Sequence, residues 1–555
     1  MAKNLRNRLT CVLPVIAGLF ALSAALPASA QSFRTQCPNG TATHPANVGS
    51  SGLSSFDTMI PTDPKRPTPA MANPQIKCQE ISGGDGYATM ADGHQIYLFA
   101  FGPLSGLKNI QAGIEGTVTA AEFNAPYVGF PTSTTTYSTG GPLLPADLSH
   151  LSNINTGASE PSLIMNLGVL SGQTPAPSIA VDEDDELYLT LTNVGMIMRP
   201  DLFEQHTVHW HGYPNASSFF DGVPDASVAI NIAGSFTYYY IAPDAGTYFW
   251  HCHITPPEHL QMGMEGQLWV RPRQNRLPVN ASLYAALDNF ETGAALVVPT
   301  AAPSGATAVA YGNVSFPPEN CAFDALCTTP VPPPNGAVQV LARDGSGTNT
   351  MKYAYNDGDG STAYDVEVPI QLMGFDPTFH FIGMTFNQEP FVDMKDKYYL
   401  FSGRGYPDTV GGGLVNTSLP QGIDPGPLAT EGSDGVSRYS QVIPTKIVLN
   451  KTSLKQTRAL LRISNLSVTE FHYVATAGIP MTVIAHAGRM LRDLAGNNEF
   501  YGTNSLEVGP GDNVDVIVDA SNVSPGTYFL YTPSLDRLSN DAENFGGMMT
   551  EIQVN

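Results

Sequence analysis

A strand pattern that occurs in both halves of the chain is the feature that most limits the possible folds. Ala245–His253 reads AGTYFWHCH and Pro525–Pro533 reads PGTYFLYTP, so the same frame appears twice. Upstream of these segments, LTLTNVG at Leu189–Gly195 parallels LLRISNLS at Leu460–Ser467. Short alternating apolar segments separated by turns rich in glycine and proline indicate strands rather than helices. The repeat therefore predicts an all-β chain with two Greek-key β-sandwich domains.

The domain boundaries follow from the composition around the two copies. We expect the first sandwich at residues 96–272 and the second at residues 346–555. Residues 31–95 are rich in proline and glycine and are expected to form an irregular extension, whereas residues 273–345, which contain PVPPPNG, read as a linker or covering loop. In the first half, strands are expected at Gln95–Phe101, Ser178–Asn193, Ala229–Tyr240 and Gly246–His253.

Residues 1–30 have the pattern of a secretory signal peptide. Lys3, Arg6 and Arg8 precede an apolar run, and the small residues Ala28-Ser29-Ala30 are typical of a cleavage site. No other segment is apolar over the length that a membrane span needs. We therefore expect an exported protein, either periplasmic or secreted, without a membrane span.

The cysteine count agrees with export. Cys11 would leave with the signal peptide, and the five cysteines that remain are an odd number, which sets one thiol apart. If Cys252 is that thiol, four are left to form disulfides, which persist in oxidising compartments. Four cysteines allow three pairings. Proximity in the sequence favours Cys37–Cys78 and Cys321–Cys327.

The chain is strongly acidic, with a formal net charge of −23 at pH 7. This charge argues against nucleic acid or an anionic membrane surface as a partner. It favours cationic partners or metal ions, and it is equally explained by solubility outside the cytoplasm. The acidic run Asp182–Glu186 begins an expected strand, and we place it on a solvated rim.

Six of the 12 histidines lie between residues 206 and 259, in the segments HTVHWHG and HCHITPPEH. A cysteine lies among them and a methionine follows. Imidazole, thiolate and thioether groups select copper, and two histidines, one cysteine and a distant methionine are the ligands of a type 1 (blue) copper site. The residues expected to bind this copper are His206, Cys252, His259 and Met264.

The spacing of the histidines predicts a second site beside the first. Residues two apart in a strand share a face, so His251 and His253 point one way and Cys252 the other. In HTVHWHG, the last two histidines share a face and His206 opposes them. The Cys252 backbone would then link the two sites and give electrons a short covalent path. The residues of the second set are His209, His211, His251 and His253.

These segments resemble the copper-binding domain of the multicopper oxidase family. HTVHWH is similar to that family's HPxHLH element, and HCH followed by His259 and Met264 is similar to its HCH-x-H-x-M element. The resemblance implies cupredoxin-like domains and the type 1 ligands named above. It also implies that the second set is half of a trinuclear cluster (type 2 and type 3 copper) that reduces dioxygen. His259 follows Cys252 by seven residues where oxidases usually have five, as in the longer loop of copper nitrite reductases.

The second copy lacks the metal ligands. It has Tyr531, Thr532 and Pro533 in place of HCH, so we expect no type 1 copper there, and its sequence resembles the copper-free middle domain of laccase-type oxidases. In the family, a trinuclear cluster takes four histidines from each of two domains, within a chain or across subunits. Two-domain members of the family with type 1 copper in the first domain are typically trimers, so the resemblance implies that a homotrimer is possible here. An ordinary structural role is the stronger interpretation for three remaining histidines: His380, His472 and His486.

Three functions are compatible with these residues. The first is a copper-dependent oxidoreductase that takes electrons from a small-molecule or metal-ion reductant and passes them through Cys252 to a second copper site, where dioxygen is reduced. The second is a non-enzymatic electron carrier or copper-binding protein with a redox protein as partner. The third is an enzyme similar to nitrite reductase. The four additional histidines favour the oxidase, because an electron carrier does not need them.

Overall fold

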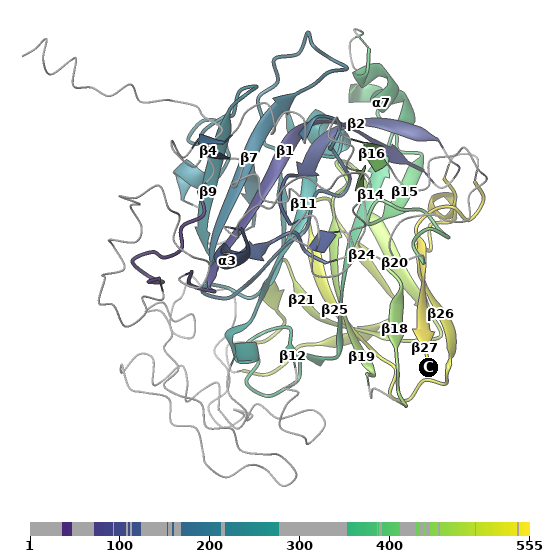
Figure 1. Cartoon of the computed structure of the whole chain (residues 1–555). Helices are drawn as coiled ribbons and strands as arrows, with labels where there is room; N and C mark the ends of the chain where they lie inside the picture. The colour runs from purple at the N-terminus through teal and green to yellow at the C-terminus, as the bar shows by residue number, and fades with distance from the viewer. Residues whose placement is uncertain are drawn as a thin grey trace, which may run out of the picture. The chain divides into compact units, whose positions relative to one another are not determined.

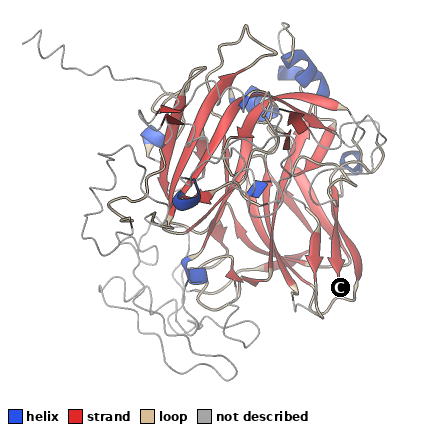
Figure 2. Cartoon of the chain, in the orientation of Figure 1, coloured by secondary structure: helices blue, strands red, loops and turns tan. Residues whose placement is uncertain are grey.

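The computed structural model describes residues 36–46, 72–123, 168–276, 352–410 and 445–555, together with four short strands between these ranges. Breaks within the ranges fall at 91, 93, 107–108, 111–113, 213–216, 386, 388–390, 453–455, 494–495 and 541–542. The expected signal peptide, the Cys321–Cys327 pair and most of the 273–345 linker lie outside the described residues. The prediction of an all-β chain is confirmed, with strands that far outnumber the short helices among these residues (Figure 2).

Two sheets form the first sandwich (Figure 1). One sheet has the order β2 (Gln95–Pro103), β1 (Ile76–Thr89), β7 (Glu186–Gly195), β9 (Ser235–Ile241), with β3 (Val118–Thr119) beside β1. The other has the order β6 (Ile179–Asp182), β11 (Glu265–Arg271), β10 (Gly246–His251), β8 (His209–His211). Their inner faces bury a core that includes Phe101, Leu189, Trp210 and Trp250.

The second sandwich is built in the same way. One sheet has the order β15 (Tyr398–Phe401), β14 (Val366–Phe375), β19 (Arg458–Asn465), β25 (Asn513–Asp519), β21 (Met481–His486), β22 (Arg489–Met490), with β23 (Tyr501–Thr503) beside β21. The other has the order β18 (Ile447–Leu449), β27 (Met549–Val554), β26 (Gly526–Tyr531), β20 (His472–Ala477), β24 (Ser505–Val508). A separate apolar core fills this sandwich.

The remaining described elements are short. The helices are α3 (Ala120–Phe123), α5 (Pro256–Gln261) and α7 (Pro377–Gly383), and the 3₁₀ turns are η3 (Ser218–Phe220), η4 (Arg273–Arg276), η5 (Phe391–Asp393) and η6 (Leu535–Leu538). The isolated strand pairs are β4 (Ser152–Asn153) with β5 (Ala158–Ser159), β12 (Lys352–Tyr353) with β13 (Ala363–Tyr364), and β16 (Ala429–Glu431) with β17 (Ser437–Tyr439). None of the described helices has the length and apolar character needed to cross a bilayer.

The internal repeat extends to the sheet topology. The order β2-β1-β7-β9 in the first sandwich corresponds to β15-β14-β19-β25 in the second, and the order β6-β11-β10-β8 corresponds to β18-β27-β26-β20. The pairs β1/β7 and β14/β19 are parallel, and so are β6/β11 and β18/β27. The two sandwiches are therefore two copies of one fold, and positions in one can be compared with positions in the other.

The expectation that residues 31–95 form only an irregular extension is wrong for their last part. Residues 76–89 form β1, the second strand of the first sheet. Its glycines suggested a loop, but close packing requires them: a Cβ at Gly86 would lie 1.9 Å from the carbonyl oxygen of Gly172. The predicted disulfide between Cys37 and Cys78 is present and ties the preceding segment to β1.

The prediction that the acidic run Asp182–Glu186 lies on a solvated rim is also wrong. Glu183, Asp184 and Asp185 form a turn that divides the expected strand 178–193 into β6 and β7, and they are buried rather than solvated. Cations cover them: the Arg273 guanidinium donates to both carboxylate oxygens of Asp184, at 2.8 and 2.6 Å. The run therefore anchors the start of the segment that leads away from the first sandwich. The strand expected from residue 229 begins only at Ser235, after Ala233 adopts a positive φ of 64°.

Candidate metal centre

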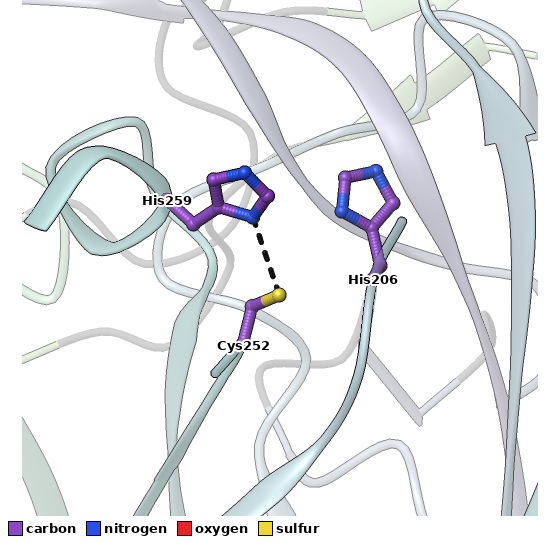
Figure 3. A group of neighbouring side chains, drawn as sticks. All are labelled: His206, Cys252 and His259. Carbon is purple, nitrogen blue, oxygen red and sulfur yellow. Dashed lines mark hydrogen bonds between the residues drawn. The ribbon is translucent and has the colours of Figure 1, made fainter. Parts of the chain in front are cut away.

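Three of the predicted type 1 ligands converge in the first sandwich. The nitrogen and sulfur atoms that His206, Cys252 and His259 could offer to a metal lie within 4.8 Å of one another, and all three side chains are fully buried. Figure 3 shows the two imidazole rings and the thiol pointing toward one another. Cys252 directly follows β10, and His259 lies on α5, so the sheet and the helix fix two of the three positions.

His206 is held by backbone contacts on both sides. Its N–H donates to the Ile230 carbonyl at 3.1 Å, and its carbonyl accepts from the Ile230 N–H at 2.9 Å. The side-chain amide of Asn193, near the end of β7, donates to the carbonyls of both Glu204 and Ile230, at 2.8 and 2.9 Å. Asn193 therefore attaches the segment that carries His206 to strand β7 of the first sheet.

Met264, the fourth predicted ligand, lies at the same group. Its N–H donates to the His259 carbonyl at 2.8 Å, and its carbonyl accepts from the Cys252 N–H at 3.0 Å. A Cβ at Gly83 of β1 would lie 2.8 Å from Cδ2 of His206 and 3.5 Å from Cε of Met264. The thioether end of Met264 and the His206 ring therefore both face position 83, where only glycine leaves them room.

The electrostatics of the group favour a thiolate. Nδ1 of His259 lies 3.2 Å from Sγ of Cys252, and the Thr207 N–H donates to the same sulfur at 3.4 Å. Burial alone raises the pKa of the Cys252 thiol, but His259 and the backbone donors outweigh burial and bring it below its ordinary value of 9.0. Burial lowers the pKa of His259, but the thiolate outweighs it and raises that pKa to about 10. Thiolate is the form in which cysteine binds metals.

The unsatisfied nitrogens of His206 test whether this group fits a metal. Among the described residues, neither ring nitrogen of this fully buried imidazole has a hydrogen-bond partner. Burial, and the nearby His259, hold the pKa of His206 well below its usual range, so the ring is neutral and free to act as a ligand. Buried polar groups without partners are rare in folded proteins, and such groups can mark the position of a bound ion. Neutral imidazole, thiolate and thioether together fit copper.

The second predicted set also gathers, on the opposite face of the Cys252 segment. His209 and His211 come from β8 and His251 from β10, and their ligand atoms lie within 4.8 Å of one another. The His253 ring centroid lies 4.9 Å from that of His209 and 5.7 Å from that of His251. The eight predicted residues therefore separate into the two neighbouring groups that strand alternation predicts.

Hydrogen bonds orient two of these imidazoles. His209 donates from Nδ1 to the Asp221 carbonyl at 2.7 Å, and His251 donates from Nδ1 to the Cys252 carbonyl at 2.7 Å. With Nδ1 occupied, Nε2 carries the lone pair, which is how a bond on one ring nitrogen selects the metal-binding tautomer. Burial lowers the pKa of His209 and that of His211, and it lowers the pKa of His251 to about 3, so all three are neutral at pH 7.

The second sandwich brings no histidine to either group among the residues that the structure describes. Nδ1 of His380 contacts the Tyr97 carbonyl at 2.5 Å, His472 contacts the Ser467 hydroxyl at 2.6 Å, and His486 contacts the Tyr501 hydroxyl at 3.0 Å. Instead, the loop before β25 approaches the second set, because a Cβ at Gly511 would lie 3.3 Å from Cε1 of His211. Asp512, next in that loop, acts on the His211 ring by raising its pKa against the effect of burial.

Sequence reasoning missed the residues that hold the ligands. Glu204 lies against the first group, with Oε2 3.6 Å from Nε2 of His259. Asn193 fastens the His206 segment, and the Asp221 carbonyl orients His209. Asn193 and Glu204 had a usable pattern in the sequence, since the repeat places Asn465 and Glu470 at the corresponding positions of the second copy.

Comparison with known proteins decides the family. A family model described as "Multicopper oxidase" matches residues 157–275, and a second model with the same description matches residues 435–551. The chain belongs to the multicopper oxidase family. Each matched region covers part of one sandwich, and the first contains all eight predicted ligands.

The similar sequences align over a short segment. A multicopper oxidase of Talaromyces pinophilus is 35% identical over 108 residues, which cover 19% of this chain and 16% of that protein. An L-ascorbate oxidase of Cucumis sativus is 32% identical over 113 residues, 19% of this chain and 17% of that protein. The matches thus span less than a fifth of either relative. Among solved structures, a blue copper oxidase from Nitrosomonas europaea is 16% identical, with 86% of this chain and 85% of that chain covered and a TM-score of 0.43.

Proposed function

We propose that this member of the multicopper oxidase family is an exported copper-dependent oxidoreductase. His206, Cys252, His259 and Met264 would hold a type 1 copper, and His209, His211, His251 and His253 would hold copper of the type 2 or type 3 kind. Copper bound at these residues would supply one-electron redox chemistry. The proposal rests mainly on one observation, the buried and unpartnered nitrogens of His206 beside a cysteine that favours the thiolate.

The residues of this chain would connect the two sites. His251, Cys252 and His253 are consecutive, so the first group and the second share one stretch of backbone. The hydrogen bond from His251 to the Cys252 carbonyl adds a contact between them. An electron accepted beside His259 would have a bonded path through Cys252 to either neighbouring histidine. The reductant would be a small molecule or a metal ion, and the electron acceptor dioxygen.

Two further features belong to the proposal. Export rests on residues 1–30, with their basic start, apolar run and Ala28-Ser29-Ala30 cleavage pattern. A homotrimer would bring a second chain to the His209–His253 face, where the side chain of His211 is exposed. Such a neighbour is the remaining source of ligands for a complete trinuclear cluster, because the described part of the second sandwich supplies no histidine to that face.

Copper content tests the proposal directly. The copper bound per chain should be measured in copper-loaded protein, with Cys252→Ser and His209→Ala as separate variants. We expect more than one copper per chain, with Cys252→Ser losing the blue absorption and His209→Ala losing only copper that is not blue. Wild-type protein that binds no copper, or a Cys252→Ser variant that stays blue, would overturn the assignment.

A second candidate is an electron carrier that does not reduce dioxygen. The observation in its favour is that the protein's own Gly511 loop approaches His211, in a region where a second set of histidines would be required. The carrier predicts one copper per chain and no oxygen uptake with a phenolic reductant. The oxidase predicts oxygen uptake that disappears in His209→Ala.

A further inference from the structure

The second sandwich repeats the backbone of the metal centre. In the first sandwich, the Cys252 N–H donates to the Met264 carbonyl at 3.0 Å. In the second, the Thr532 N–H donates to the Met548 carbonyl at the same distance of 3.0 Å. Thr532 and Met548 follow β26 and precede β27 as Cys252 and Met264 follow β10 and precede β11. Thr532 therefore takes the position of the cysteine, and Met548 that of the methionine.

Arg537 takes the position of His259. The Met264 N–H donates to the His259 carbonyl at 2.8 Å, and the Met548 N–H donates to the Arg537 carbonyl at 3.1 Å. His259 lies on α5 and Arg537 on η6, the short helical turn that follows the corresponding strand of the second sandwich. Arg537 follows Thr532 by five residues, and His259 follows Cys252 by seven.

His472 takes the position of His206. Asn465 donates to the carbonyls of Glu470 and Val508, both at 2.8 Å, as Asn193 donates to Glu204 and Ile230. His472 pairs with Val508 in the sheet, as His206 pairs with Ile230. Each histidine is also two residues after a glutamate, Glu470 or Glu204. Both imidazoles are fully buried.

The guanidinium of Arg537 contacts the groups that would surround a metal. It lies 3.1 Å from Nδ1 of His472, forms an ion pair with Glu470, and lies 5.5 Å from the ring centre of Tyr399. In the first sandwich, Glu204 faces His259 and Phe99 packs against the His259 ring. The two histidines differ in one respect: the nitrogens of His472 contact Arg537 and Ser467, whereas those of His206 have no partner among the described residues.

We infer that the second sandwich contains a degenerate type 1 site in which the Arg537 guanidinium occupies the place of the metal. This inference rests on the proposed function, which assigns the copper ligands of the first sandwich. Charge agrees with it, because a divalent copper ion with a thiolate carries one positive charge, as a guanidinium beside a threonine hydroxyl does. The backbone of a copper site is retained, and two side chains, Thr532 and Arg537, prevent copper from binding.

Restoring the two side chains tests the inference. Thr532→Cys and Arg537→His are introduced together in a Cys252→Ser background, where the native blue site is lost. We expect the intense blue absorption to return and bound copper to rise by one per chain relative to the Cys252→Ser parent. A variant that folds, judged by an unchanged circular dichroism spectrum, yet gives no thiolate-to-copper absorption would overturn the inference. The matched control, Thr532→Ser with Arg537→His, should fold and remain colourless.

A measurement without copper keeps the inference testable if the triple variant does not fold. Arg537→Ala should lower the midpoint of thermal unfolding, because Glu470 and His472 lose the cation between them, and millimolar methylguanidinium should restore part of the loss. Arg489→Ala, at an exposed arginine of β22, is the control and should respond to neither. An Arg537→Ala variant with unchanged stability, or with no rescue, would contradict a cation site. Failure of the wild-type protein to bind copper would count against the proposed function but would leave this result standing.

Discussion

Asn193 shows how a single side chain can position the residues of the proposed metal site without contacting them. Its amide satisfies the carbonyls of Glu204 and Ile230, and its oxygen accepts from the Gly195 N–H at 3.0 Å. Asn465 makes the same three bonds in the second sandwich, to Glu470, Val508 and Ser467. The pair therefore separates the contribution of this asparagine to folding from its contribution to the metal centre.

The substitutions Asn193→Ala and Asn465→Ala should both lower the free energy of unfolding, by about 1–3 kcal/mol each, because two carbonyls lose their donor. Only Asn193→Ala should also weaken copper binding, because only Asn193 holds the segment that carries His206. Urea unfolding measures the first effect, and copper titration measures the second. Equal loss of copper affinity in the two variants would show that general destabilisation, and not the position of His206, is responsible.

Glu204 is expected to change the reduction potential of the proposed type 1 site. Its carboxylate lies 3.6 Å from Nε2 of His259, and a carboxylate on the outer nitrogen of a ligand histidine makes that histidine a stronger donor. In Glu204→Gln the negative charge is gone, so the reduction potential should rise. We expect a change on the order of 60 mV, which is a tenfold shift in the ratio of oxidised to reduced protein. Spectroelectrochemical titration of the blue band measures it. Glu507→Gln, at an exposed position of β24, is the control, and equal shifts in both variants would contradict a specific role.

The sequence predicted which side chains gather in the two groups but not the residues that hold them in place. His206, Cys252, His251 and their neighbours carry a spacing that is local, so strand alternation was enough to separate the two sets. Glu204 and Asn193 act through contacts that join distant parts of the chain, for example Asn193 with Ile230. No local pattern encodes such a contact, and only the repeat of these two residues as Glu470 and Asn465 could have indicated it.

Among the elements, the N-terminal segment shows how a disulfide and polar contacts attach a segment that forms no strand. Residues 36–46 form no strand, yet they are attached to the first sandwich by the Cys37–Cys78 disulfide and by His44, whose Nδ1 lies 2.7 Å from Oε1 of Glu186. The disulfide pairing was predictable from proximity. The strand on which Cys78 lies was not, because β1 contains glycines at closely packed positions that resemble a loop in the sequence.

Removal of this disulfide should destabilise the first sandwich. The two cysteines are separated by 41 residues, and cross-linking a loop of that length stabilises a protein by roughly 3–4 kcal/mol in the chain-entropy model. We therefore expect Cys37→Ser with Cys78→Ser to lower the free energy of unfolding by about that amount, as measured by urea unfolding at neutral pH. Copper content should be unchanged at low urea. A variant as stable as the wild type would mean that the contacts of His44 hold the segment without the disulfide.

At the scale of the whole molecule, the sequence predicted two sandwiches but could not predict the contacts between them. The repeat fixed the number of domains and their common topology. The contacts depend on polar residues inside strands, such as Gln267 of β11, which donates to the Arg462 carbonyl and the Ser464 hydroxyl of β19 at 2.9 and 2.6 Å. The Thr247 hydroxyl of β10 donates a hydrogen bond to the Asp515 carboxylate of β25 at 2.5 Å. In the sequence, each of these polar residues interrupts the apolar pattern of a strand, but the pattern does not show which residue of the other sandwich it contacts.

Arg462 joins these contacts and leads to the last prediction. Its guanidinium is fully buried and lies 2.8 Å from Glu367, 3.5 Å from Asp515 and 3.0 Å from the Thr247 hydroxyl. Arg462→Met keeps the apolar length of the side chain but leaves the two carboxylates without this cation. Breaking a buried ion pair in this way costs about 3–5 kcal/mol. We expect that loss in the free energy of unfolding from urea titration at pH 7, whereas Arg489→Ala, at an exposed position of β22, should change it little.

The pH dependence of stability distinguishes the loss of this charge pair from a simple packing defect. Burial raises the pKa of Glu367, but Arg271 and Arg462 outweigh burial and bring it to about 2, below its ordinary value of 4.5. Because the folded state has the lower pKa, the contribution of Glu367 to stability is complete above pH 4.5 and is lost as the pH falls toward 2. The wild-type free energy of unfolding should therefore fall more steeply across this range than that of Arg462→Met, which has already lost part of the contribution. Parallel curves would show that Arg462 stabilises the contact between the sandwiches through packing and not through its charge.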